Sequence, residues 1–171
     1  MKERWKNAFI LAVLGFVIAA FAGWVYEELC VRIKYGAFSP RGMLDLPLLP
    51  IYGFGAWSLA VLLRRIRSVW LFFALSVVIS SVFEYACSFL LELIFHKSFW
   101  TYSDWPLAVH DRISLISSIV FGLLAVMFIK VVLPFVRLIM RKTPQRFLLF
   151  LSGAFVFVIF SDFIKVICQN E

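Results

Sequence analysis

The sequence predicts an all-α, polytopic integral membrane protein with about five transmembrane helices, and two observations lead to this class. Hydrophobic residues make up 63% of the 171 positions, with a mean hydropathy of +0.96, against about 45–50% apolar residues in soluble domains. These residues also gather in stretches close to the ~20 residues that a helix needs to cross a bilayer. Only short connections separate the stretches, so we expect a single transmembrane domain over residues 1–171. The five stretches are Ala8–Leu29, Pro47–Leu63, Val69–Phe95, Ile113–Pro134 and Phe147–Ile167.

The distribution of charge predicts the orientation of these helices. With a cytoplasmic N-terminus and five crossings, the cytoplasmic side holds eleven Lys and Arg residues and one acid, and the outer half holds six bases and nine acids. This is the positive-inside pattern, which places the C-terminus outside the cell. The net charge of +7 therefore indicates topology and contact with anionic lipids of the bilayer rather than nucleic-acid binding.

The first stretch follows the basic residues of Lys2–Lys6 and ends at Glu27 and Glu28. A cleavable signal peptide ending at Ala20-Phe21-Ala22 is an alternative interpretation. The apolar run is long for a signal peptide and continues without a polar break, which favours an uncleaved helix.

The second stretch begins irregularly. Two prolines, Pro47 and Pro50, followed by Gly53, disfavour a regular helix over its first half and predict a broken or re-entrant start. Unwound backbone inside a membrane commonly lines a cavity and supplies ligand-binding groups. A simple proline kink is the alternative. Arg41 and Tyr52 flank this start.

The third stretch carries a carboxylate at membrane depth, Glu84, which costs at least ~2.5 kcal/mol to insert. Ser80, Glu84, Ser88 and Glu92 follow one another at i+4 steps and therefore share one face of the helix. Glu84 either forms an ion pair with Arg41 or Arg112, or it binds a ligand or a proton. The sequence leaves both interpretations open.

The connection after the third stretch, residues 96–112, is polar and aromatic, and the fifth stretch carries Asp162 and Lys165 one turn apart. Interfacial anchoring explains some Trp and Tyr residues of such a connection. The acid-rich groups nevertheless converge on the outer leaflet, and we expect the Tyr102 hydroxyl to face water or a ligand there. The predicted pocket comprises Glu27, Arg41, Tyr52, Glu84, Glu92, Trp100, Tyr102 and Arg112.

This pocket would bind or translocate a small polar molecule or a lipid headgroup. One alternative is a membrane-embedded enzyme with Glu84 or Glu92 as general base and Arg112 stabilising an anion. A second is a non-catalytic subunit of a membrane complex. The question of enzymatic activity stays open, since the chain contains no serine elbow, HExxH or paired-histidine motif.

Cys30, Cys87 and Cys168 lack metal-ligand spacing and favour packing roles over a disulfide, so neither a metal nor a cofactor is expected.

Several motifs occur in an order that resembles a known family: Gly23-Trp24-x-x-Glu27, Arg41-Gly-x-Leu44, Pro50-Ile-Tyr-Gly53, Phe83-Glu84-Tyr85, Leu91-Glu92, Trp100-x-Tyr102-Ser103 and Arg112-Ile113-x-Leu115. Over about residues 23–134 the chain is similar to the small bacterial membrane proteins labelled putative ABC-transporter type IV, also called CmpB-like. The chain departs from the family's usual residues at Leu46, Thr101, Ala108 and Asp111. The resemblance implies a permease component in the bacterial cytoplasmic membrane, with no established substrate. No GxxxxGK[ST] phosphate loop occurs, so an ATPase would be a separate subunit; a second copy of the chain is the other partner left open.

Overall fold

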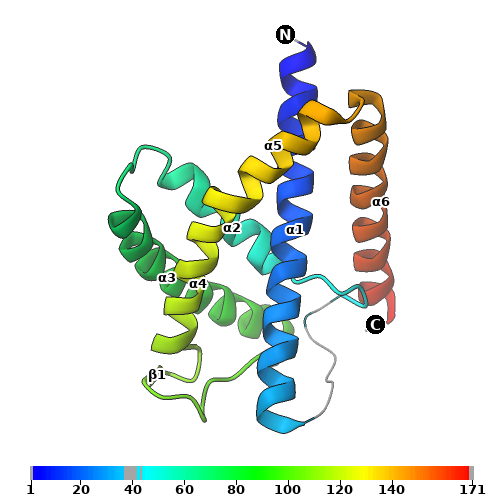
Figure 1. The fold of residues 1–171 in the computed structure, drawn as a ribbon. Coiled ribbons are helices and arrows are strands. Elements are labelled where there is room, and N and C mark those ends of the chain that lie inside the picture. The colour runs from blue at the N-terminus through cyan, green and yellow to red at the C-terminus, as the bar shows by residue number, and fades with distance from the viewer. Residues whose placement is uncertain (1, 37–41, 43, 170–171) are drawn as a thin grey trace. The chain divides into compact units, whose positions relative to one another are not determined.

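The computed structural model describes residues 2–36, 42 and 44–169, and these residues are predominantly helical. Its elements (Figure 1) are α1 (Lys2–Tyr35), α2 (Pro50–Leu62), α3 (Val69–Phe95), β1 (Ala108–Val109), β2 (Ile113–Ser114), α4 (Leu115–Met127), the π-helical turn η1 (Phe128–Val132), α5 (Leu133–Lys142) and α6 (Gln145–Gln169). Within the described part of the chain, four helical stretches are long and apolar enough to cross a membrane: Glu3–Ile33, Val69–Phe95, Leu115–Lys142 and Gln145–Gln169. The predicted all-α membrane class is confirmed.

The second predicted stretch differs in length from the prediction. Its helix, α2, has 13 residues, fewer than the ~20 that cross a bilayer as a helix. It starts at Pro50 because a helix begun earlier would need the N–H that Pro50 lacks and would place Leu49, the residue before a proline, in the disfavoured helical conformation. Proline fits the first turn, whose N–H groups have no intrahelical acceptor. The residues before it, from Leu44 to Leu49, form no helix, and the proline-broken start is therefore as predicted.

The fourth predicted stretch ends later than Pro134. Helix α4 starts at a capping box, in which the backbone N–H of Ser117 donates to Oγ of Ser114 and the N–H of Ser114 donates to Oγ of Ser117, both at 3.2 Å. The wider turn η1 then leads into α5, and Pro134 lies in the first turn of α5. Proline is tolerated in the first turn of a helix, so the helical path continues through η1 to Lys142.

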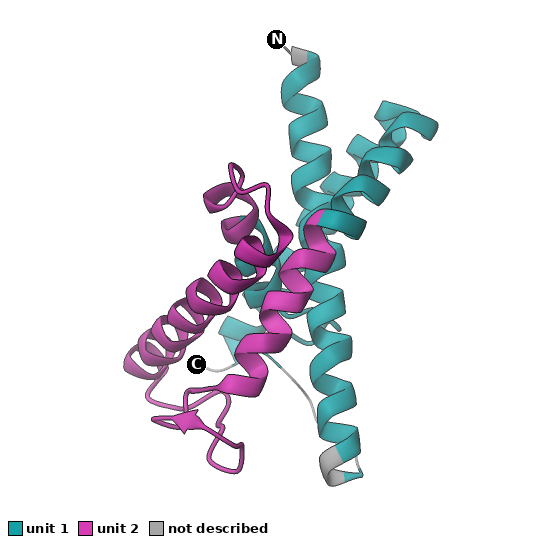
Figure 2. Ribbon diagram, turned by 60° about the vertical axis from the view of Figure 1, so that its left-hand side comes forward, with its two compact units in different colours: residues 1–57, 130–171 teal, residues 58–129 magenta. Residues whose placement is uncertain are grey.

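The chain divides into two compact units, residues 1–57 with 130–171, and residues 58–129 (Figure 2). In the first unit, α5 and α6 pack against α1. Two bonds show that residues 49–57 run antiparallel to α1: the Leu49 N–H donates to the Ala20 carbonyl and the Trp57 indole to the Ala12 carbonyl, both at 3.1 Å. Ala20, Leu44 and Leu48 form the buried core there.

The second unit is a pair of antiparallel helices, α3 and α4, closed at one end by the connection 96–114 (Figure 2). Gly122 allows close packing, because a Cβ at this position would lie 2.6 Å from Val77. Next to it, the Ser81 hydroxyl donates to Ser118 Oγ at 2.7 Å. The strands β1 and β2 form a short antiparallel hairpin in which Ala108 pairs with Ser114.

Candidate functional site

Helix α3 buries several polar residues, and many of its apolar residues are exposed. Ser76, Glu84 and Ser88 are buried, while Val78 and Val82 are more than half exposed. This arrangement is the inverse of a soluble amphipathic helix and suits a helix whose surroundings are lipid. Of the predicted stripe Ser80, Glu84, Ser88 and Glu92, the structure buries Glu84 and Ser88, whereas Glu92, near the end of α3, is 47% exposed.

Glu84 receives a hydrogen bond from the connection after α3. Its side chain is only 4% exposed, and the Tyr102 hydroxyl donates to its Oε1 at 2.7 Å. The backbone N–H of Tyr102 donates to the Asp111 carbonyl at 2.9 Å, and its ring packs edge-on against Trp105. The expectation that this hydroxyl faces water or a ligand is therefore wrong: it bonds to the buried carboxylate. Such burial disfavours Glu84 as a general base for a bound substrate.

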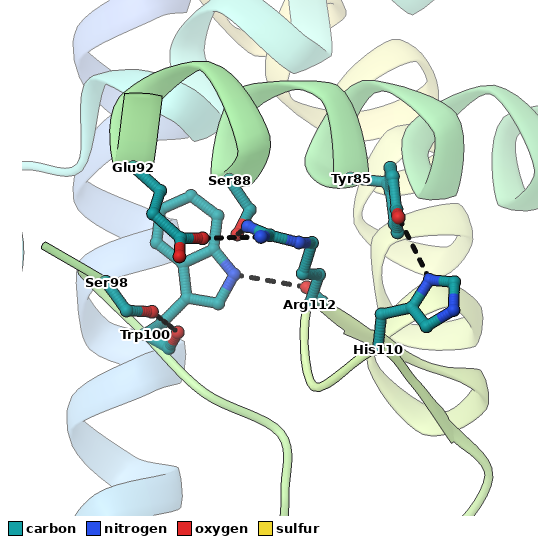
Figure 3. Close-up of polar contacts among 7 residues, drawn as sticks. All are labelled: Tyr85, Ser88, Glu92, Ser98, Trp100, His110 and Arg112. Carbon is teal, nitrogen blue, oxygen red and sulfur yellow. Dashed lines mark hydrogen bonds and ion pairs between the residues drawn. The ribbon is translucent and has the colours of Figure 1, made fainter. Parts of the chain in front are cut away.

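Arg112 lies along α3 and contacts four of its side chains. Nη2 pairs with Oε2 of Glu92 at 2.5 Å and Nη1 donates to Oγ of Ser88 at 3.1 Å (Figure 3). The guanidinium carbon lies 5.9 Å from the ring centroid of Tyr85 and 5.7 Å from that of Phe89, within the range of cation–π attraction. We call these five residues the arginine cluster: Tyr85, Ser88, Phe89, Glu92 and Arg112.

This geometry changes the predicted pairing. The sequence left Arg41 and Arg112 open as ion-pair partners of Glu84. In the structure Arg112 forms its ion pair with Glu92 and not with Glu84. Arg41 lies outside the described residues.

The hairpin that presents Arg112 has an unusual backbone. His110 and Asp111 have φ angles of 50° and 58°, a conformation that non-glycine residues adopt rarely and that tends to occur at functional sites. The Arg112 N–H closes the turn on the Val109 carbonyl at 3.1 Å. The Trp100 indole donates to the Arg112 carbonyl at 3.2 Å (Figure 3). Trp100 thus fixes the backbone of Arg112.

Sequence reasoning missed three contributors to this site. Tyr85 and Phe89 belong to the arginine cluster, and His110 contacts the Tyr85 hydroxyl through Nδ1 at 2.9 Å (Figure 3). The signal for the two rings was present, because Tyr85, Phe89 and Glu92 are spaced by four and three residues and share one helix face. His110 had no such signal, since its position depends on the turn.

Two predicted pocket residues form a separate contact in the first unit. The Tyr52 hydroxyl donates to Oε1 of Glu27 at 3.0 Å, and the Tyr52 ring lies directly over Gly23. Nearby in the sequence, Asp45 pairs with Lys165 at 2.6 Å and the Leu46 N–H donates to Asp162 at 3.2 Å. The second unit brings together the others that are described: Glu84, Glu92, Trp100, Tyr102 and Arg112.

Two kinds of charge are therefore available to a ligand in the second unit. The planar guanidinium of Arg112 matches the geometry of a carboxylate or phosphate, and Glu92 can accept from a cation. Their side chains are 20% and 47% exposed, unlike the buried carboxylate of Glu84.

The family described as putative ABC-transporter type IV matches residues 14–167, which includes all eight predicted pocket residues. No curated protein and no solved structure matches the chain. Together with the four helical stretches that could span a membrane, the family match fits a membrane transporter component. The match extends over most of both compact units and well beyond the motifs that first indicated it, and on this basis the chain belongs to the putative ABC-transporter type IV family.

Proposed function

We propose that this protein is the membrane-embedded component of a transporter and that its arginine cluster binds a small polar molecule or a lipid headgroup. The observation that carries the proposal is the partly exposed ion pair between Arg112 and Glu92 at the end of an apolar helix. An ion pair between exposed side chains contributes only about 0–1 kcal/mol to stability, and the Glu92 side of this pair is 47% exposed. Folding alone therefore gives little reason for placing both charges there, whereas binding of a charged ligand does.

We also propose the orientation that the charges predict, with a cytoplasmic N-terminus and an external C-terminus in a bacterial cytoplasmic membrane. The short helix α2 is compatible with a crossing. Its 13 residues rise about 20 Å at 1.5 Å per residue, and the non-helical segment from Leu44 to Leu49 precedes it, bent by a hydrogen bond from the Leu48 N–H to the Leu46 carbonyl at 2.7 Å. A crossing of the ~30 Å hydrocarbon core by this stretch would therefore combine α2 with non-helical backbone covered by neighbouring helices.

Cysteine labelling tests this orientation. In a background without the three native cysteines, a cysteine at Ser103 is expected to react with a membrane-impermeant maleimide on intact cells. A cysteine at Ser68 is expected to react only after permeabilisation, because α3 separates the two exposed positions. The cysteine-free chain is the control. Reaction of both positions from the same side would contradict the five-crossing topology.

Comparing bound molecules among variants tests the ligand site. Purified protein is incubated with a bacterial polar-lipid extract or a water-soluble extract, washed, and its bound compounds are identified by mass spectrometry. Arg112→Gln is expected to lose the specifically retained compound by about tenfold or more, because a charge-assisted bond contributes about 1.5–3 kcal/mol. Lys97→Gln is the matched control, since it removes a positive charge from the same connection while the arginine cluster stays intact. Equal retention by Arg112→Gln and the wild type would refute the site.

A separate ATPase subunit completes this proposal. The chain carries two short basic segments, Arg64–Ser68 and Arg137–Arg146, the second of which includes the end of α5 and the start of α6, and the proposed orientation places both in the cytoplasm. Their basic residues are exposed and could contact an acidic surface of such a subunit. Energy coupling through this subunit is consistent with the family's name.

A further inference from the structure

We infer that the ligand of the arginine cluster is a zwitterion that carries one acidic group and one ammonium group. The inference rests on the proposed function, since it takes the arginine cluster as the binding site and names the class of its ligand. Amino acids and ethanolamine-phosphate groups, whether free or in a lipid headgroup, belong to this class.

The two charges of the arginine cluster are paired with one another. Nη2 of Arg112 and Oε2 of Glu92 are paired at 2.5 Å, so a ligand group that takes the place of either side chain in this pair separates them. An anion on Arg112 would leave Glu92 unpaired and repelled by the ligand. A cation on Glu92 would leave the less exposed Arg112 without its carboxylate, which is unfavourable for a partly buried charge. A zwitterion gives each side chain a new partner and leaves neither unpaired.

Replacing Glu92 by the acidic group of a ligand needs little movement of Arg112. Its guanidinium keeps the hydroxyl of Ser88 and the rings of Tyr85 and Phe89 when Glu92 turns away. Glu92 is the more exposed partner at 47%, so its side chain is free to rotate outwards. Phe89 is itself half exposed, and its ring can attract an ammonium group as well.

The segment that contains the arginine cluster carries a net negative charge. Residues 84–112 contain four acids, Glu84, Glu92, Asp104 and Asp111, and two bases, Lys97 and Arg112. The net negative charge disfavours a purely anionic ligand, whereas a zwitterion adds no net charge. Among one-charge ligands a cation would be favoured by this field, yet it would leave Arg112 unpaired.

Equilibrium binding to the purified protein tests the inference. The lipid probes, presented in nanodiscs, are phosphatidylethanolamine, its N-acetylated form, which keeps the phosphate and lacks the ammonium, and anionic phosphatidylglycerol. Soluble glycerophosphoethanolamine, a phosphodiester without net charge, and glycine are the free zwitterions, with inorganic phosphate and acetate as the anionic probes. We expect at least one zwitterion to bind about tenfold more tightly than its anionic counterpart, the effect of one charge-assisted contact.

Glu92→Gln is expected to reduce this preference to about onefold, because the amide gives no charge to the ammonium group, while Arg112-dependent binding persists. Asp111→Asn is the matched control: it removes an exposed acid next to Arg112, and asparagine tolerates the positive φ of this position. It is expected to keep the preference. Binding by phosphatidylethanolamine alone would indicate a lipid headgroup as the source, and binding by a soluble probe a free metabolite; both support the inference.

The inference is overturned if no zwitterion is preferred over its anionic counterpart, or if Glu92→Gln keeps the preference. Tight, Arg112-dependent binding of phosphatidylglycerol or phosphate would overturn it and leave the proposed function intact. Binding that is independent of Arg112 for every probe would refute both.

Discussion

Replacing Tyr102 by phenylalanine is expected to lower the free energy of unfolding by about 1.5–3 kcal/mol, the usual contribution of a hydrogen bond to a charged group. The hydroxyl donates to Glu84 at 2.7 Å, and the carboxylate is 4% exposed, so water does not readily replace the lost donor. The substitution removes one oxygen and leaves the contact of the ring with Trp105 in place. Equilibrium unfolding in detergent micelles measures the change.

Tyr85→Phe is the matched control for this prediction. It removes the same atom from a tyrosine whose hydroxyl contacts His110 in an exposed position, so the expected loss is within about 0.5 kcal/mol. The Glu84→Gln and Tyr102→Phe double variant should lose less than the sum of the two single variants, because both single changes disrupt the same bond. Equal losses in Tyr102→Phe and Tyr85→Phe, or strict additivity, would show that the hydroxyl of Tyr102 does not stabilise Glu84.

The membrane class and the polar face of α3 could be predicted because both are local properties of the sequence. Hydropathy over ~20 residues indicates a spanning helix, and the i+4 spacing from Ser80 to Glu92 fixes a common face whatever the helix packs against. The irregular start of the second stretch was also predictable, since proline removes a backbone donor at a known position. The length of α2 was not predictable, because it depends on how Leu44, Leu48 and Leu49 become buried against α1 and α6.

The pairing of the polar residues could not be predicted, because it depends on the conformation of a connection without helical periodicity. Arg112 reaches Glu92 because a turn with two residues at positive φ, His110 and Asp111, presents it there. Neither residue is a glycine, so no strong signal for this backbone was present in the residue types. The contact between Tyr52 and Glu27 is equally non-local and requires α2 to run antiparallel to α1.

Replacing Gly23 by alanine is expected to lower the free energy of unfolding by about 2–4 kcal/mol, combining overpacking, the lost Tyr52–Glu27 hydrogen bond and a partly offsetting gain in helix propensity. A Cβ at this position would lie 2.1 Å from Cγ of Tyr52, so the ring must move and its hydroxyl leaves Glu27. Thermal and chemical unfolding of the purified variant in detergent measure the effect.

Gly55→Ala is the control, because a Cβ at this position of α2 meets no atom within 4 Å. It is expected to be neutral or to stabilise the protein by up to about 1 kcal/mol through helix propensity, so the two glycine substitutions should differ in sign. A second comparison isolates the ring: in a Tyr52→Ala background, Gly23→Ala should no longer destabilise the protein, because the clashing partner is gone. If Gly23→Ala and Gly55→Ala behave alike, or if the Tyr52→Ala background gives no relief, the Tyr52 ring does not pack on Gly23, and the close approach of α2 to α1 requires a different arrangement.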